Sequence, residues 1–354
     1  MNLNNEIRAF LVEKGAIKVG FATKETMRGD PPGADISYLL KEAKSAVCFA
    51  LPLDKTMIRA FLRKELPYGR ADHERDNIQT NQKAFQLAKE LSAILKQKGF
   101  KAIPVIPNNK YREDIPGWRI KMPPEVSLRY LAVRSGVGSF GWSGNVGIKD
   151  IGTTIILGGV VTDAELTATD PVPHDEEFCT KCKICTKVCA LRMFSDSKEV
   201  EINLGGYAFR YAERIDKRRC HIVCGGFSGL DKTMEWSTWS PGRYPYPETE
   251  KELSRLYSIS IGNAAKWPKN EDGSNGYDDP KLGGKVQLTC GNCQIICWGD
   301  PKETAKNYKI LKNSGCIVQE ETGELKRLSK KEAEDYFNSL PKKRRKLYYK
   351  NYKK

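Results

Sequence analysis

The stretch CTKCKICTKVC, residues 179–189, determines the fold that we predict for this chain. Its four cysteines follow one another at intervals of three, three and four residues. A tight loop with three such cysteines can hold one face of a cubane iron–sulfur cluster, and the fourth cysteine in runs of this kind usually binds a second cluster. We therefore expect a second group of cysteines elsewhere in the chain.

A second group lies in CGNCQIIC, which supplies three cysteines but lacks the leading cysteine of the first run. Each cubane needs four thiolates, so one more ligand must come from Cys220 or Cys224, which lie between the two runs. In two-cluster ferredoxins each run gives its last cysteine to the other cluster. This arrangement predicts one cluster on Cys179, Cys182, Cys185 and Cys297, and another on Cys189, Cys290, Cys293 and either Cys220 or Cys224.

The alternative for the first run is a structural zinc site, which usually shows two separated pairs of cysteines or added histidines. Here the cysteines come as a triple plus one, and the three histidines of the chain are scattered. Two [4Fe-4S] clusters are therefore the better interpretation. Of the remaining cysteines, Cys48 lies in an apolar stretch typical of a buried strand, and Cys316 belongs to no pattern.

The composition is that of a folded protein with room for about two domains. Of the 354 residues 40% are hydrophobic and 29% are charged, and no run approaches the ~18 apolar residues of a membrane span. The opening MNLNNEIRAFLVEKG has neither the blocks of a secretory signal nor paired arginines. We expect a cytoplasmic location and no membrane partner, and in that reducing compartment the eleven cysteines favour metal binding over disulfides.

Much of the net charge of +15 is concentrated at the C-terminus, where KKRRKLYYKNYKK (342–354) carries eight basic residues and no acid. Such a tail could bind a phosphate backbone while its tyrosines stack on bases. It could also be a solvated terminus that aids solubility, which is the interpretation that the sequence alone favours.

Short apolar strands and amphipathic helices alternate through the first 165 residues, which predicts an α/β (α+β) layer structure. A polar linker, 163–178, leads into a cysteine-rich part that contains an aromatic insert, 221–289. Within this insert, MEWSTWSPGRYPYPE (234–248) could line a substrate pocket or pack over an irregular cluster domain. The expected helices cover residues 4–14, 76–98 and 123–136, and the expected strands cover residues 17–22, 46–52, 100–107 and 153–163. After the cysteine-rich part, a strong apolar pattern occurs only in EAEDYFNSL (332–340).

Three features together resemble the epoxyqueuosine reductases and the related reductive dehalogenases. They are the closing CGNCQIIC, the cysteine after a pair of arginines in RRC, and the loop LAVRSGVGSFGWSGNVGI (131–148). TTIILGGVVTD (153–163) is similar to the strand that follows this loop in the family, and YGRADHERDN (68–77) resembles a further family region more weakly. The resemblance covers roughly residues 1–300.

The resemblance implies a particular division of the chain. Residues 1–165 would form a nitroreductase-like, corrinoid-binding α/β domain, and residues 166–310 a ferredoxin-like domain with two [4Fe-4S] clusters. Residues 311–354 would form a charged C-terminal segment with the basic tail. The RRC context matches the family, so it favours Cys220 over Cys224 as the eighth cluster ligand.

The resemblance also implies a cobalamin bound base-off beside the nearer cluster. The loop at 136–147 suits this cofactor, because its glycines let the backbone approach a large planar ligand, a tryptophan offers a flat apolar surface, and polar side chains can bind amide arms. From spacing alone, the same loop could be a glycine-rich turn between a helix and a strand. The expected cofactor-binding residues are Gly138, Gly141, Trp142, Ser143 and Asn145.

The proton donor is less clear, because Met122 stands where epoxyqueuosine reductases carry a catalytic aspartate. Methionine cannot donate a proton, so we take Tyr111, Glu125 and Tyr130 as candidate catalytic residues, with Asp114 as a further nearby carboxylate. The expected function is a cytoplasmic, cobalamin-dependent reductase that receives electrons from a ferredoxin or flavodoxin and acts on a small molecule or tRNA. One alternative is a double-cluster electron-transfer protein without corrinoid catalysis. Another is a tRNA-modifying reductase that uses the basic tail.

Overall fold

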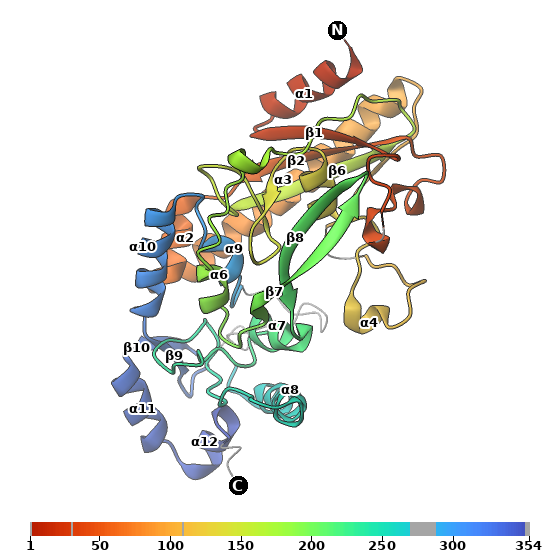
Figure 1. Cartoon of the computed structure of the whole chain (residues 1–354). Helices are drawn as coiled ribbons and strands as arrows, with labels where there is room; N and C mark the ends of the chain where they lie inside the picture. The colour runs from red at the N-terminus through yellow and green to blue at the C-terminus, as the bar shows by residue number, and fades with distance from the viewer. Residues whose placement is uncertain (1, 30, 108–109, 270–287, 351–354) are drawn as a thin grey trace.

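The computed structural model describes residues 2–29, 31–107, 110–269 and 288–350. The N-terminal part is built on a four-stranded, fully antiparallel sheet with the strand order β1-β2-β6-β3 (Figure 1). All four strands overlap the segments that the apolar runs predict, and β1 and β2 each extend one residue beyond them. They are β1 (Lys18–Thr23), β2 (Ser45–Pro52), β3 (Ala102–Pro104) and β6 (Ile155–Thr162).

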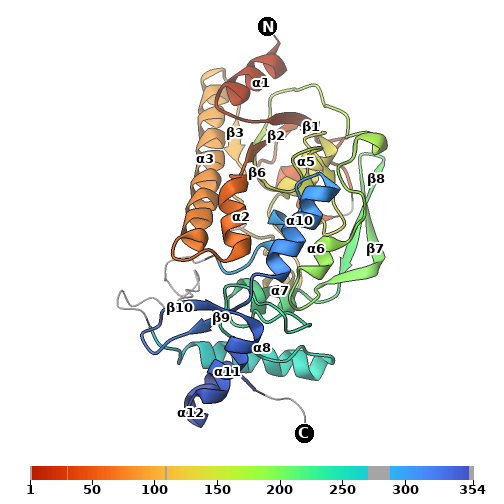
Figure 2. The ribbon, with the colours of Figure 1, turned by 90° about the vertical axis from the view of Figure 1, so that its left-hand side faces the viewer.

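Helices cover both faces of this sheet, which explains why its strands are continuously apolar. In β2, Val47, Phe49 and Leu51 face the core formed with α1 (Leu3–Glu13) and α3 (Gly69–Gln97). The alternate residues Ala46, Cys48 and Ala50 face the core formed with α5 (Leu128–Arg134). Cys48 is therefore a buried core residue, as its sequence context predicts, and Figure 2 shows α3 running along one side of the sheet.

The helices differ from the prediction mainly at their starts. Helix α3 begins at Gly69, seven residues before the expected start, and ends before Gly99, as expected. Helix α5 begins only at Leu128, because the side chain of Ser127 caps it by accepting a hydrogen bond from the backbone of Tyr130. The sequence did not reveal α2 (Lys55–Arg63), although Asp54 caps its first turn.

A long β-hairpin connects the two parts of the molecule, and nothing in the sequence pattern predicted it. Its strands are β7 (Phe194–Leu204) and β8 (Tyr207–Arg214). The tip reaches back to the N-terminal part, where Gly205 donates a backbone hydrogen bond of 2.8 Å to Arg28. Figure 1 shows both strands beside the sheet. Phe209 and Tyr211 of β8 pack on the core that contains α5, and Phe194 of β7 lies in a cluster with Cys185 and Cys189.

The core continues from the sheet into the cysteine-rich part without a break. Trp236, Trp239 and Tyr244 of the 234–248 stretch are at most 3% exposed and belong to this core, so the packing interpretation of that stretch holds. Residues 270–287 of the aromatic insert lie outside the described residues. The remaining elements here are α6 (Ile184–Lys187), α7 (Lys217–Cys224), α8 (Glu250–Ala264), α9 (Asn292–Ile295) and α10 (Pro301–Lys312).

The C-terminal segment is folded at least to residue 350. Tyr348 is fully buried, stacks on Trp267 with ring centroids 5.3 Å apart, and donates a hydrogen bond of 2.9 Å to Gln319. This part of the basic tail is therefore not a loose terminus, and residues 351–354 of the tail lie outside the described residues. The elements are β9 (Cys316–Gln319), β10 (Leu325–Leu328), α11 (Lys330–Ser339) and α12 (Lys342–Tyr348).

Short elements complete the structure between α3 and β6 and in the connecting loops. They are α4 (Trp118–Lys121), the two-residue strands β4 (Ser139–Phe140) and β5 (Val146–Gly147), and 3₁₀ turns at Pro32–Ala34, Ile36–Tyr38 and His174–Glu176. Within the described ranges, no helix is long and apolar enough to cross a bilayer.

Candidate iron–sulfur centres and the adjoining interface

The first group of thiols lines a common cavity. Its walls include Cys179, Cys182, Cys185 and Cys297, and it encloses about 470 Å³ of empty space, its open mouth included. Lys181 and Lys183 have left-handed backbone angles, with φ of 54° and 57°, and these turns bend the loop around the cavity. The structure therefore brings together three cysteines of the first run and the last cysteine of the second.

The second run is fixed to the start of β6 by hydrogen bonds. Thr153 donates from its backbone to the carbonyl of Cys297 at 3.0 Å, and the side chain of Gln294 donates to the carbonyl of Ile155 at 3.0 Å. These contacts explain how a cysteine loop late in the chain comes to lie beside a loop that begins more than a hundred residues earlier.

The second group of thiols gathers Cys189, Cys220, Cys290 and Cys293, and each of the four lies close enough to others of the group for their charges to interact. Cys220 and Cys224 are one turn apart on α7, with their sulfur atoms 3.4 Å from each other. Cys224 contacts Cys220 and Cys290, whereas Cys220 also faces Cys189 and Cys293. The geometry thus favours Cys220 as the fourth member of this group.

Burial dominates the acidity of most of these thiols. It raises the pKa of Cys185 and of Cys189 to about 12, while hydrogen bonding with Cys224 lowers the pKa of Cys290 to about 7. Because only thiolates bind metal, metal binding here must release protons. Among the described residues, no three His, Cys, Asp or Glu side chains converge on a single metal ion. The donor set of each group, four thiols, is what a four-iron cluster requires.

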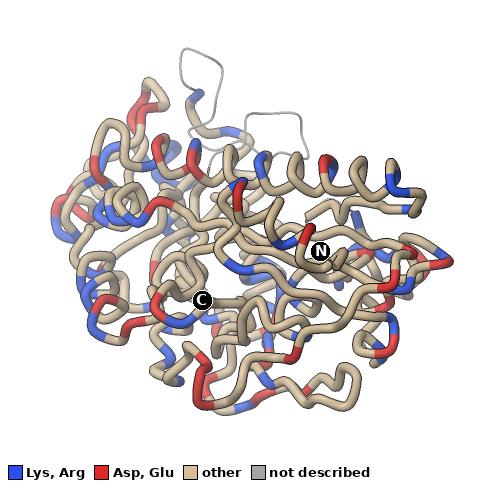
Figure 3. The backbone as a smooth tube through the Cα atoms, turned by 90° about the horizontal axis from the view of Figure 1, so that it is seen from above, with Lys and Arg blue, Asp and Glu red and all other residues tan. Residues whose placement is uncertain are grey.

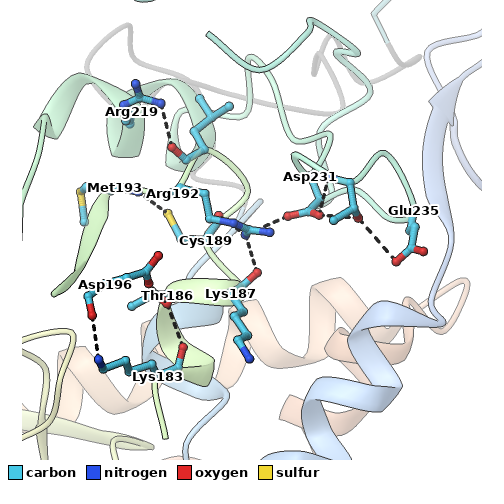
Figure 4. Close-up of polar contacts among 12 residues, drawn as sticks. Lys183, Thr186, Lys187, Cys189, Arg192, Met193, Asp196, Arg219, Asp231 and Glu235 are labelled. Atoms are coloured by element: carbon cyan, nitrogen blue, oxygen red, sulfur yellow. Dashed lines mark hydrogen bonds and ion pairs between the residues drawn. The ribbon is translucent and has the colours of Figure 1, made fainter. Parts of the chain in front are cut away.

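A buried ion pair holds the turn that follows Cys189 (Figure 4). Arg192 donates to the backbone carbonyl of Cys189 at 2.7 Å and forms an ion pair of 2.9 Å with Asp231, whose side chain is fully buried. Met193 donates its backbone N–H to the sulfur of Cys189 at 3.3 Å. No sequence pattern indicated this network, because Asp231 comes from the aromatic insert.

The glycine-rich loop lies between the two thiol groups. Trp142 donates its backbone N–H to the sulfur of Cys179 at 3.3 Å, and the side chain of Asn145 donates to the carbonyl of Cys293 at 3.2 Å. The indole N–H of Trp142 donates to Ser195 at 3.0 Å, and Ser143 is only 2% exposed. Each of these predicted cofactor-binding side chains therefore contacts or lies among protein atoms.

Two glycines of this loop are required by close packing against protein side chains. A Cβ atom on Gly141 would lie 2.8 Å from the ring of Phe178. A Cβ atom on Gly144, whose φ is +71°, would lie 2.9 Å from the ring of Tyr211 on β8. Gly138 is packed similarly against the backbone of Gly147. The space that Gly141 and Gly144 leave open is thus filled by side chains of the chain itself, one from the hairpin and one from the loop before Cys179.

Tyr130 is the catalytic candidate that lies beside this interface. Burial, and next the neighbouring Tyr211, raise the pKa of Tyr130, and Arg129 and Arg214 lie close to it. Its ring meets Phe140 edge-on, with centroids 6.4 Å apart. Neither the hairpin nor its Tyr211 and Arg214 could be connected to Tyr130 from the sequence.

The other two candidates belong to the loop around α4. Tyr111 forms a β-bridge with Pro124 and stacks on Trp118, with ring centroids 6.5 Å apart. Glu125 donates its backbone N–H to Lys110 at 3.3 Å and its side chain is half-buried. Met122 ends α4 with a left-handed φ of 44°.

No model of a known protein family matches this chain, and none of the curated proteins matches it. Solved structures do match, at low sequence identity. A catabolic reductive dehalogenase is 16% identical over 72% of this chain and 33% of its own, with a TM-score of 0.43. An epoxyqueuosine reductase with a tRNA-Tyr stem loop is also 16% identical, over 88% of this chain and 81% of its own, with a TM-score of 0.42.

An epoxyqueuosine reductase from Streptococcus thermophilus is 16% identical over 58% of this chain and 56% of its own, with a TM-score of 0.35. This mixed α/β chain is therefore structurally similar to reductive dehalogenases and epoxyqueuosine reductases, although sequence identity is low. It spans about a third of the length of the dehalogenase.

Proposed function

We propose that this protein is an iron–sulfur oxidoreductase that passes electrons through two [4Fe-4S] clusters toward the interface between the sheet and the hairpin. The observation that carries the proposal is the crosswise grouping of the thiols: Cys297 joins the first run, and Cys189 joins the second. When bound, such clusters supply one-electron transfer at potentials set by hydrogen bonds, charge and exposure.

The surroundings of the first thiol group support electron donation from outside. Cys182 is exposed, and the exposed Lys181 and Lys187 lie in the same loop. A small acidic electron carrier such as a ferredoxin or flavodoxin is suited to a surface of this charge, because opposite charges steer docking.

Hydrogen bonds and burial from the chain's own residues would set the reduction potentials of the two centres. Backbone N–H groups of Trp142 and Met193 donate to sulfurs of Cys179 and Cys189, one in each group, and such hydrogen bonds raise a cluster's potential. The second group lies deeper, since Cys290 is buried. Arg129 lies near Cys293, and Arg214 lies near Cys220. Both features support the second group as the one from which electrons leave.

Tyr130 is the proton donor that this geometry supports best. Its raised pKa keeps the phenol protonated at neutral pH, and it lies near Arg129, which is itself close to Cys293 of the second thiol group. Tyr111 and Glu125 remain candidates only if the segment around α4 approaches the interface during turnover.

The corrinoid that the resemblance implies does not fit the loop from which we predicted its binding. The rings of Phe178 and Tyr211 occupy the space next to Gly141 and Gly144. The polar groups of Trp142 and Asn145 donate hydrogen bonds to protein carbonyls. We therefore derive no step through a corrinoid. The function that the residues support is the double-cluster redox protein without it.

The decisive experiment is anaerobic reconstitution with iron and sulfide, followed by metal analysis, EPR of the reduced protein and addition of cobalamin. We expect about eight irons per chain, two interacting reduced clusters and no cobalamin retained after gel filtration. Bound zinc, or about four irons, would overturn the two-cluster proposal. Retention of one base-off cobalamin per chain would leave the clusters intact but overturn the proposed absence of the corrinoid.

The tRNA alternative loses part of its support. Base stacking needs exposed aromatic rings, and Tyr348 of the tail is buried against Trp267. The cations of α12 could still contact phosphates. Salt-dependent tRNA binding that is lost when exposed Lys342, Lys343 and Lys346 are changed to glutamine would restore this alternative.

A further inference from the structure

Three cations from separate elements converge beside the second thiol group. Arg129 comes from α5, Arg214 from the end of β8, and Lys217 from the start of α7. Burial, and next the nearby charge of Arg214, lower the pKa of Arg129 to about 10. Burial and the charges of both arginines also lower the pKa of Lys217, so the three side chains share one half-buried region.

These cations have no acidic partner among the described residues, where no ion pair involves any of the three. Arg129 donates to the backbone carbonyl of Gly144 at 2.9 Å, and Lys217 donates to the carbonyl of Lys121. The Nε of Arg214 is buried and has no hydrogen-bond partner in the part of the chain that the structure describes. The region therefore holds three positive charges and one unsatisfied donor.

Some other cations among the described residues form ion pairs with acids. Figure 3 shows Lys and Arg interspersed with Asp and Glu along the backbone. Arg218, which directly follows Lys217, binds both Asp216 and Glu250. Holding three like charges close together in a half-buried region is unfavourable unless a counter-ion binds there.

We propose that Arg129, Arg214 and Lys217 bind a small oxyanion, the carboxylate or phosphate group of an acidic electron acceptor. Two guanidinium groups and an ammonium suit this class, because guanidinium matches planar oxyanions with two parallel hydrogen bonds and the ammonium adds a compact charge. The inference rests on the proposed function and names its substrate class. Tyr130 and Tyr211 line the same region, so a bound acid would lie within reach of a phenol.

A competing explanation is that the cations serve only as counter-charge to a cluster. Arg129 lies near Cys293, and Arg214 lies near Cys220. Under that explanation an added anion would find no saturable site, although removal of a cation would still lower the potential of the second cluster. The two explanations therefore differ in anion binding, not in redox potential.

The test uses the reconstituted holoprotein with inorganic phosphate and with acetate as probes, at constant ionic strength. Calorimetry measures binding, and EPR of the reduced protein reports whether one cluster senses the anion. We expect saturable binding of at least one probe, a change in the signal of one cluster, and at least about tenfold weaker binding after Arg214→Gln or Arg129→Gln, because one charge-assisted contact is lost. Preference for acetate identifies a carboxylate acceptor, and preference for phosphate identifies a phosphorylated one.

Arg8→Gln is the matched control, because Arg8 is also half-buried and also donates to a backbone carbonyl, that of Val19 at 2.8 Å, but lies on α1. Its anion binding should equal that of the wild type. Absence of saturable binding, or equal weakening in Arg8→Gln and Arg214→Gln, overturns the oxyanion site. Iron analysis distinguishes failure of the oxyanion site from failure of the proposed function. About eight irons per chain without anion binding would refute only the oxyanion site. Fewer irons in the wild type would refute the proposed function.

Discussion

The packing of the hairpin on the glycine-rich loop can be tested with a pair of glycines. Gly144 and Gly206 both have a positive φ, of +71° and +85°. A Cβ atom on Gly144 would lie 2.9 Å from the ring of Tyr211, whereas one on Gly206 would have no atom within 4 Å. Changing each glycine to alanine therefore imposes the same backbone strain at both sites but a steric clash only at Gly144.

The expected losses of folding stability follow from the backbone strain and the steric clash. Left-handed backbone costs an alanine roughly 1–2 kcal/mol, which is the whole loss that we expect for Gly206→Ala. Overpacking adds about 1–3 kcal/mol at Gly144, for a total of about 2–5 kcal/mol. The clash is not easily relieved, because the residue after Tyr211, Ala212, is held by a backbone hydrogen bond of 2.8 Å to Trp142.

The assay is anaerobic urea unfolding of the reconstituted protein, followed by tryptophan fluorescence, with iron content measured for both variants. Gly144→Ala should unfold at clearly lower urea than Gly206→Ala. Equal midpoints would refute the reasoning, because they would mean that β8 does not press on the loop. In that case the surface of the loop would be open to a ligand, and our argument against a corrinoid there would fail.

Three further predictions concern the cysteines, a buried lysine and the tail. Cys220→Ser should reduce the iron content from about eight to about four per chain, while Cys224→Ser should retain about eight; the reverse result would make Cys224 the ligand. Burial lowers the pKa of Lys64 to about 7, below its usual value near 10.4, so the unfolded state binds more protons between these values. Stability should therefore rise by at most about 5 kcal/mol between pH 7 and pH 10 in the wild type but not in Lys64→Met, and parallel pH profiles in urea would contradict this. Tyr348→Ala should destabilise the protein by about 3–5 kcal/mol, because it empties a buried aromatic site; an unchanged urea midpoint would show that the tail is loose after all.

The sequence could predict what depends on local patterns. Each strand of the sheet was visible as a short apolar run, since helices cover both faces and every residue of β2 before Pro52 is buried. The thiol groups were visible because cluster ligands must lie at fixed short intervals on a loop, whatever surrounds them. Both patterns arise from interactions within a few residues of each other in the chain.

What the sequence could not predict depends on contacts between distant segments. The hairpin of β7 and β8 carries few buried side chains in its central part, so it lacks the apolar alternation of a covered strand. Its register with the rest of the molecule is set by backbone groups, such as Gly205 with Arg28, which leave no mark on side-chain patterns. For the same reason, the sequence could not show that Arg129 and Arg214 lie close to each other.

The glycines illustrate how a correct physical requirement can point to the wrong partner. The sequence required something to approach Gly141 and Gly144 closely, and a planar cofactor was one candidate. In the structure two aromatic rings of the chain itself meet that requirement. A glycine pattern specifies a distance of approach and a backbone conformation, but it does not specify whether a ligand or a side chain makes the approach.

Crosswise sharing of the thiols has a consequence for folding. Because Cys297 belongs to the first group and Cys189 to the second, neither group can be complete until the two runs meet. Binding of the proposed clusters would therefore contribute free energy only to the state in which the two runs have already met. The same linkage means that loss of iron from either group should loosen the hairpin as well, and with it the region where Arg214, Arg129 and Tyr130 meet. Cluster assembly and formation of the proposed acceptor site are in this way one event.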